Sequence, residues 1–308
     1  MTHIALVTAR AARGTDPDMP PLLAALREAG AQVHEVDWDD DDVDWSSYDL
    51  ALLRSTWDYA HRVQEFLDWA ARVAEQTHLQ NPLAVIRWNS DKHYLAELAR
   101  AGVPVVPSTF AEPDDDAAAA VDTFLANLAN PSSSGAGAAE AGDFVVKPAV
   151  GAGSRDAQRH GRADRDQAVA HVRRLLDQRR AVLLQPYLRQ VDEHGETALL
   201  FFEGEFSHAV RKGPLLRRGE APTTDLYAKE TITPCEASPC ELDVARRALA
   251  AIPFAQPLLY ARVDLIRDDH GSPVLLELEL VEPSVFAGFA DGAAERFARA
   301  ILERTMNR

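Results

Sequence analysis

The chain has 308 residues, of which 32 are Lys or Arg and 48 are Asp or Glu, so its formal net charge is −16. This excess of carboxylates argues against a nucleic-acid partner, because binding to phosphate backbones needs clustered basic side chains. No apolar run approaches the ~18 residues of a membrane span, so no membrane partner and a cytoplasmic location are expected. The two cysteines, Cys235 and Cys240, are too few for a disulfide framework and lack the partners of a zinc site.

The first 88 residues alternate apolar strands with amphipathic helices. Strands are expected at residues 4–8, 32–36 and 50–54, and helices at 21–28 and 63–75. This alternation is typical of an open parallel sheet covered by helices. Residues 1–88 are therefore predicted to form an N-terminal α/β domain with a parallel sheet.

Two further units are expected, at residues 89–188 and 189–308. The first is predicted to begin with a linker helix at 89–100, followed by strands at 144–146 and 182–185 and a helix at 166–180. The second is predicted to contain two hairpins, which pair 197–202 with 206–211 and 259–266 with 274–280, and a last helix at 292–304.

Lysine is rare in this chain. Only four of the 32 basic residues are lysines: Lys92, Lys147, Lys212 and Lys229. Because arginine serves wherever a generic cation is enough, a lysine that is kept can mark a place that needs a compact ammonium group. The alternative is chance retention on the surface.

Three carboxylates occupy the last predicted hairpin. Glu277 and Glu279 lie two residues apart in an apolar strand and project from one face, and Asp264 lies on the partner strand. Same-face carboxylates are costly to desolvate unless a cation joins them, and Mg²⁺ favours such oxygen ligands. A solvent-facing edge with alternating Glu and Leu is the alternative. Arg262, on the face of Asp264, favours a metal–phosphate centre with a catalytic arginine.

A loop of small residues follows the strand that ends in Lys147. Gly151, Gly153 and Ser154 lie in this loop, where backbone N–H groups and one ammonium group can meet phosphates. The loop is neither a Walker A motif nor a complete dinucleotide fingerprint. Taken alone, this loop favours a plain flexible connection over a phosphate site.

In this order, these features resemble the ATP-grasp superfamily over essentially the whole chain. The resemblance implies an α/β fold with a Rossmann-like N-terminal domain at 1–88 and two lobes that clasp ATP between them. The central small lobe would be 89–188, and the C-terminal lobe with the metal site would be 189–308. The implied cofactors are ATP and Mg²⁺, as two ions.

The resemblance also assigns roles in nucleotide binding. Lys92 and Lys147 look like the two phosphate-contacting lysines, and the loop with Gly151 resembles the one that closes over the triphosphate. The segment Gln185-Pro186-Tyr187-Leu188 looks like the hinge that meets the adenine edge. Asp192 falls where the family places an acidic residue on the ribose, and Lys229 is similar to a later lysine that approaches the nucleotide. Arg262 with Asp264, and Glu277 with Glu279, match the arginine and the magnesium ligands of the family.

Two positions depart from the common pattern. Glu279 stands where asparagine is frequent, and it should still bind Mg²⁺. Gln185 replaces an acidic residue at the hinge between the lobes, but its amide carbonyl can still accept a hydrogen bond from adenine.

Substrate contacts are expected in the segment that follows the strand at 50–53, because ligands of open α/β sheets bind at the carboxyl ends of strands. Arg54 is expected to pair with a carboxylate, Asp58 with an ammonium, and Ser55 and Trp57 to line the pocket. The alternative is a helix cap with Trp57 in the core. Secondary candidates are Arg211, Lys212, Glu282 and Ser284, with Phe286 as either pocket or core.

An ATP-grasp site implies that ATP phosphorylates a small amino-acid carboxylate and that a nitrogen nucleophile displaces the phosphate. The segments Arg-Ser-Thr-Trp-Asp-Tyr and Glu-Leu-Glu-Leu most resemble the actinomycete cyclo-ligases that close O-ureido-D-serine into D-cycloserine, in antibiotic biosynthesis. An intermolecular ligase that makes a dipeptide or amide is the alternative, and a non-catalytic nucleotide-binding module is a third. A homodimer is expected by default.

Overall fold

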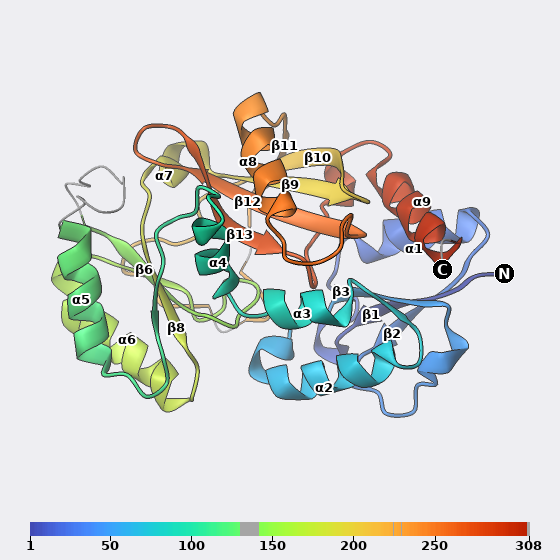
Figure 1. The fold of residues 1–308 in the computed structure, drawn as a ribbon, viewed down its shortest axis with the longest axis horizontal. Coiled ribbons are helices and arrows are strands. Elements are labelled where there is room, and N and C mark those ends of the chain that lie inside the picture. The colour runs from blue at the N-terminus through green and yellow to red at the C-terminus, as the bar shows by residue number, and fades with distance from the viewer. Residues whose placement is uncertain (130–141, 224, 229, 307–308) are drawn as a thin grey trace.

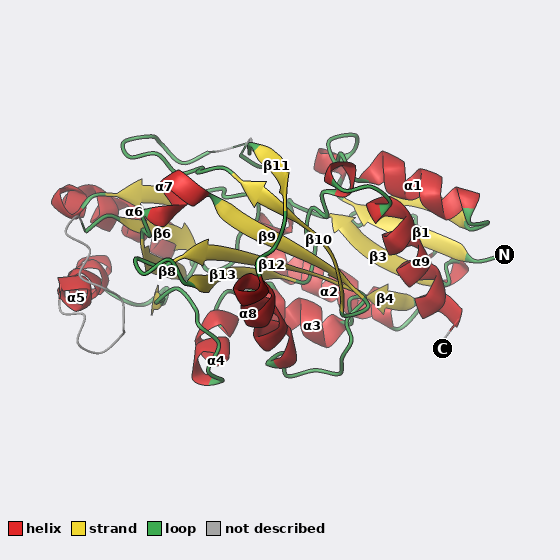
Figure 2. Ribbon diagram, turned by 90° about the horizontal axis from the view of Figure 1, so that it is seen from above, coloured by secondary structure: helices red, strands yellow, loops and turns green. Residues whose placement is uncertain are grey.

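The computed structural model describes residues 1–129, 142–223, 225–228 and 230–306. Three sheets form its framework, with strand orders β2-β1-β3-β4, β5-β8-β6-β7 and β11-β10-β9-β12-β13. The five-stranded sheet lies between the other two (Figures 1 and 2). No helix among the described residues is long and apolar enough to cross a membrane.

The N-terminal sheet is parallel, as predicted. Its strands are β1 (His3–Thr8), β2 (Gln32–Asp37), β3 (Leu50–Ser55) and β4 (His78–Gln80). Because side chains alternate along a strand, Ile4 and Leu6 pack against helices α1 (Met19–Glu28) and α9 (Ala293–Met306), which lie side by side in Figure 1. Ala5 and Val7 pack against α2 (Val63–Ala74) on the other face. Helices therefore cover both faces of the sheet.

The small sheet is antiparallel and is covered by two helices. Its strands are β5 (Thr109–Ala111), β6 (Phe144–Pro148), β7 (Gln158–His160) and β8 (Val182–Pro186). Apolar side chains of β6 and β8 pack against α5 (Ala117–Ala129) and α6 (Arg165–Asp177). This places Lys147, on the alternate face of β6, away from that core.

The large sheet is also antiparallel. Its strands are β9 (Glu196–Phe202), β10 (Glu205–Lys212), β11 (Ile232–Cys235), β12 (Tyr260–Arg267) and β13 (Pro273–Glu279). One face packs against α4 (Tyr94–Arg100) and α8 (Pro239–Ala250). The short helix α7 (Gln190–His194) precedes β9. The β12–β13 register sets Arg262 opposite Glu279 and Asp264 opposite Glu277, so the predicted metal-site residues share a face.

The three predicted ranges each contain one sheet, but two helices pack outside their own range. Helix α4 packs against the large sheet, and the C-terminal helix α9 packs against the N-terminal sheet. The single helix expected at 89–100 is wrong: α3 (Leu83–Asn89) ends before Lys92 and α4 begins after it. This break lets the Lys92 side chain leave the helical path toward the small sheet.

Candidate active site

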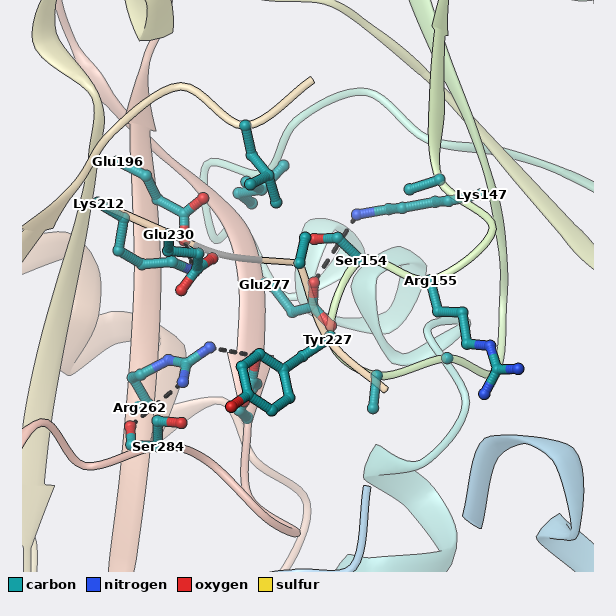
Figure 3. A pocket seen from close by; sticks show the side chains of 18 of the residues that line it. Lys147, Ser154, Arg155, Glu196, Lys212, Tyr227, Glu230, Arg262, Glu277 and Ser284 are labelled. Atoms are coloured by element: carbon teal, nitrogen blue, oxygen red, sulfur yellow. Dashed lines mark hydrogen bonds and ion pairs between the residues drawn. The ribbon is translucent and has the colours of Figure 1, made fainter. Parts of the chain in front are cut away.

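A cavity of about 570 Å³ lies where the small and large sheets meet, and residues of the N-terminal domain contribute to its wall. Most of the residues expected to bind nucleotide, metal or substrate line it: Trp57, Lys92, Lys147, Gly151, Gly153, Ser154, Gln185, Tyr187, Leu188, Lys212, Arg262, Glu277, Glu279, Glu282 and Ser284. Figure 3 shows Lys147 and Arg262 entering it from opposite sides, with Glu277 between them.

Two of the rare lysines meet on one carboxylate. The Nζ atom of Lys92 lies 3.0 Å from Glu277, and that of Lys147 lies 3.8 Å from it. Burial raises the pKa of Glu277, but the two ammonium groups outweigh burial and hold the pKa below its usual value. Burial lowers the pKa of Lys147. The pair therefore presents two desolvated ammonium groups to one part of the cavity, which suits binding of phosphates.

The glycine loop is closely packed at its middle. The amide of Ala228 donates to the carbonyl of Gly153 over 3.0 Å, and Lys92 Nζ donates to the carbonyl of Gly151 over 2.8 Å. Gly153 has φ +61°, and a Cβ there would lie 2.7 Å from the Cβ of Tyr227. Only glycine fits this position, because it must combine a left-handed backbone with a close neighbour.

Arg262 joins two of the predicted metal-site carboxylates. Its guanidinium donates to Asp264 over 2.9 Å and to Glu279 by a short bond, and it also donates to the carbonyl of Ser284 over 3.2 Å. Asp264 is 1 % exposed and lies 3.3 Å from Lys212 Nζ. Asp264 is not among the residues that line the cavity, and its role as a metal ligand stays a prediction of the sequence.

The remaining carboxylates fit a magnesium ion that substrate phosphates help to hold. No cluster of three or more His, Cys, Asp or Glu ligands is preformed in the described part of the chain. Glu277 and Glu279 nevertheless project together into the cavity from β13. Burial, reinforced by Asp264 and Glu277 against Arg262, raises the pKa of Glu279 to about 7. This donor set carries unbalanced negative charge that Mg²⁺ would relieve, and Mg²⁺ needs only one or two protein carboxylates.

The predicted hinge lies where β8 ends. The Gln185 amide nitrogen donates to Ser108 Oγ over 2.9 Å, which leaves its carbonyl oxygen free to accept a hydrogen bond, as expected for adenine. Asp192 does not line the cavity, because the Tyr187 hydroxyl donates to it over 2.6 Å and Arg159 lies 3.4 Å away. The ribose contact of Asp192 stays a prediction of the sequence. Lys229 lies outside the described residues.

Arg54 is not a cavity residue, contrary to expectation. Its side chain is fully buried, 3.6 Å from Asp16 and 3.7 Å from Asp18, and it donates to the carbonyl of Pro283 over 3.0 Å. Ser55 is buried too, with its Oγ 2.8 Å from the Thr8 hydroxyl. The carboxyl end of β3 is covered by the segment that follows β13, so these side chains support the wall and do not form it.

The other candidates divide between wall and support. Trp57 lines the cavity and donates through Nε1 to the carbonyl of Glu282 over 3.1 Å. Asp58 does not line it, because its carboxylate accepts from Trp38 over 2.9 Å and from Arg62 over 3.4 Å. Arg211 is also absent from the wall, since it lies on the opposite face of β10 from its neighbour Lys212.

Comparison with known proteins identifies the family. A family model described as "D-cycloserine synthetase DcsG, N-terminal domain" matches residues 4–81. Over 99% of both chains, the sequence is 44% identical to the cycloserine biosynthesis protein DcsG of Streptomyces lavendulae. The chain belongs to the D-cycloserine synthetase family. The crystal structure of D-cycloserine synthetase DcsG superposes with a TM-score of 0.88, covering 98% of this chain and 99% of that one at 44% identity.

More distant structures share the fold. The D-alanine–D-alanine ligase of Bacillus anthracis, complexed with ATP, gives a TM-score of 0.69 at 15% identity over 99% of this chain and 98% of that one. The ATP-grasp ligase PsnB gives 0.64 at 19% identity over 98% and 99%. The ATP-grasp fold predicted from the sequence is confirmed. The family member described here is an ATP-dependent ligase, and its substrate is a small molecule.

Several lining residues of this synthetase escaped the sequence analysis. They are Tyr59, Arg155, Glu196, Tyr227 and Glu230. Burial raises the pKa of Glu196 to about 8, although Lys212 Nζ lies 2.5 Å away. The sequence did hold a signal for Glu196, because this charged residue directly precedes an apolar strand of the predicted hairpin and Lys212 directly follows the other. In the structure the two residues pair in register. Tyr59 and Tyr227 carried no such signal.

Proposed function

We propose that this ligase closes O-ureido-D-serine into D-cycloserine, with ATP and two Mg²⁺ ions. Family membership over nearly the whole chain is the observation that carries the proposal. The cavity supports it, because lysine, arginine and carboxylate side chains converge there around a volume fit for a nucleotide and a small substrate. A cytoplasmic location and a homodimer stay predictions of the sequence.

The proposed chemistry begins with phosphoryl transfer to the substrate carboxylate. Lys92 and Lys147 would hold the phosphates, and the backbone N–H groups of Gly151 to Ser154 would cover them. Bound Mg²⁺, held by Glu277 and Glu279, would neutralise charge on the phosphate oxygens. Arg262, already hydrogen-bonded to Glu279, would stabilise the charge that develops on the reacting carboxylate.

Ring closure then joins two ends of one molecule. The oxygen-bound ureido nitrogen attacks the acyl phosphate carbon, the bond from carbon to the phosphate oxygen breaks, and phosphate leaves. Because D-cycloserine lacks the carbamoyl group, water must also cleave that group from the ring nitrogen, and it leaves as carbon dioxide and ammonia. The enzyme needs no nucleophilic side chain for this sequence, because its task is to orient the reacting atoms and stabilise charge.

The test is product analysis with Mg²⁺-ATP and a panel of small amino acids that includes O-ureido-D-serine. We expect release of ADP and phosphate with that substrate alone, together with ammonia and a product with the mass of D-cycloserine. ADP release that requires two amino acids and yields a dipeptide mass would replace the proposal with an intermolecular ligase. ATP binding without turnover of any substrate would contradict cyclisation.

A further inference from the structure

The carboxylates of the cavity differ in how their charge is balanced. Five of them line it among the described residues. Four have a cationic partner: Lys212 for Glu196 and Glu230, Lys92 and Lys147 for Glu277, and Arg262 for Glu279. The fifth is Glu282, and within the described residues no Lys, Arg or His lies within 4.0 Å of its carboxylate.

The main chain at Glu282 is nevertheless held in place. Trp57 Nε1 donates to the main-chain carbonyl of Glu282 over 3.1 Å, and Tyr59 lines the same cavity. The next carbonyl, of Pro283, accepts from Arg54 over 3.0 Å. Glu282 is only 8 % exposed. A buried carboxylate that has no cationic partner among the described residues is costly to bury unless a ligand supplies positive charge.

The surroundings of Glu282 distinguish between two kinds of cation. Two aromatic residues, Trp57 and Tyr59, line the cavity beside it, and aromatic faces attract organic ammonium groups. Mg²⁺ instead prefers an octahedral shell of oxygen ligands and water. Burial, followed by the charge of nearby Glu279 and opposed by the more distant Lys92, raises the pKa of Glu282 to about 8.

We propose that Glu282 binds the α-ammonium group of the substrate, with Trp57 and Tyr59 as the aromatic walls of this subsite. Arg262 donates to the carbonyl of Ser284, two residues after Glu282, so the two charged groups belong to neighbouring subsites. An α-amino acid carries its ammonium and carboxylate on one carbon, and binding at Glu282 directs its carboxylate toward Arg262. The inference rests on the proposed function only for the identity of the substrate, and it makes Glu282, in place of Asp58, the residue that selects an α-amino acid.

The test compares each enzyme on two substrates, O-ureido-D-serine and its deaminated analogue 3-(ureidooxy)propanoate, by kcat/KM for ADP release. In the wild-type enzyme, loss of the ammonium group should lower kcat/KM by about 10- to 100-fold, as expected for a charge-assisted hydrogen bond. In Glu282→Gln the ratio of kcat/KM for O-ureido-D-serine to kcat/KM for the deaminated analogue should fall close to one, because glutamine keeps the shape without the charge. Glu282→Asp, which keeps the charge, should retain a ratio well above one.

Asp58→Asn is the matched control, because Asp58 was the ammonium partner expected from the sequence and its carboxylate does not line the cavity. It should keep the wild-type ratio. An unchanged ratio in Glu282→Gln would overturn the proposal, and a higher Mg²⁺ requirement in that variant would make Glu282 a metal ligand. If Glu282→Gln does not fold, a ratio near one in Glu282→Asp or in wild type would equally overturn it.

Failure of the proposed function has a separate signature. If the wild-type enzyme does not consume O-ureido-D-serine, the same comparison is made with the amino acid that does stimulate ADP release and with its deaminated counterpart. If none does, the two members of each pair are compared by calorimetric binding to the enzyme with Mg²⁺-ADP. A preference for the amine that depends on Glu282 would then keep the subsite while the proposed substrate is rejected.

Discussion

Replacement of Arg54 by methionine tests whether this side chain supports the cavity wall from behind. Arg54 is fully buried between Asp16 and Asp18, at 3.6 and 3.7 Å, and the side chains of these two aspartates are only 2 % and 3 % exposed. At an effective dielectric constant of ~20, each pair contributes about 4 to 5 kcal/mol of attraction, which largely offsets the cost of burying the charges. Methionine fills much of the same volume but leaves two buried carboxylates without their counter-charge.

We expect Arg54→Met to lower the free energy of unfolding by about 3 to 5 kcal/mol, the usual cost of removing one partner from a buried ion pair. For a protein of this size, that corresponds to a fall in Tm on the order of 10 °C. The double variant Arg54→Met with Asp16→Asn should recover at least ~1 kcal/mol, because one uncompensated charge is removed with its partner.

The assay is thermal and urea unfolding followed by circular dichroism. Arg13→Met is the matched control, because Arg13 pairs with Asp37 at 3.0 Å but is 47 % exposed, and it should cost less than ~1 kcal/mol. A Tm for Arg54→Met within ~2 °C of Arg13→Met would refute the reasoning. A loss of activity in Arg54→Met without a loss of stability would also refute the reasoning, because Arg54 would then act on the substrate directly.

Three further outcomes are expected. Glu277→Gln should lower the rate of ADP release by ~100-fold or more with the fold intact, and near-normal turnover would remove β13 from the mechanism. Gly153→Ala should raise the KM for ATP at least ~10-fold, since its Cβ would meet Tyr227 at 2.7 Å, whereas Gly30→Ala, with φ +87° and nothing within 4 Å, should leave this KM unchanged. Burial, with the charge of His160, lowers the pKa of His171 from 6.5 to about 4. Because the unfolded chain binds this proton first, stability should fall as pH drops from 6.5 toward 4, by up to about 3 kcal/mol. An equal pH slope of unfolding free energy in His171→Gln would contradict that assignment.

The sequence by itself was enough to locate the chemistry of the site. Charged residues that interrupt apolar strands are visible in the sequence, because strand alternation places them on the face away from the core. Lys147, Glu277 and Glu279 were found in this way, and all three line the cavity. The spacing of two residues between the glutamates determines that they share a face in any regular strand.

Only the tertiary structure decided which polar residues reach the cavity. Arg54 and Asp58 follow a strand at the edge where ligands bind, yet the segment after β13 covers the first and Trp38 and Arg62 engage the second. Glu282 was a secondary candidate, and only the arrangement of the described charges showed that none of them lies within 4.0 Å of its carboxylate. The physical reason is that periodicity determines the face on which a side chain lies, whereas its partners depend on how separate segments pack, as Pro283 does against Arg54 from 229 residues away.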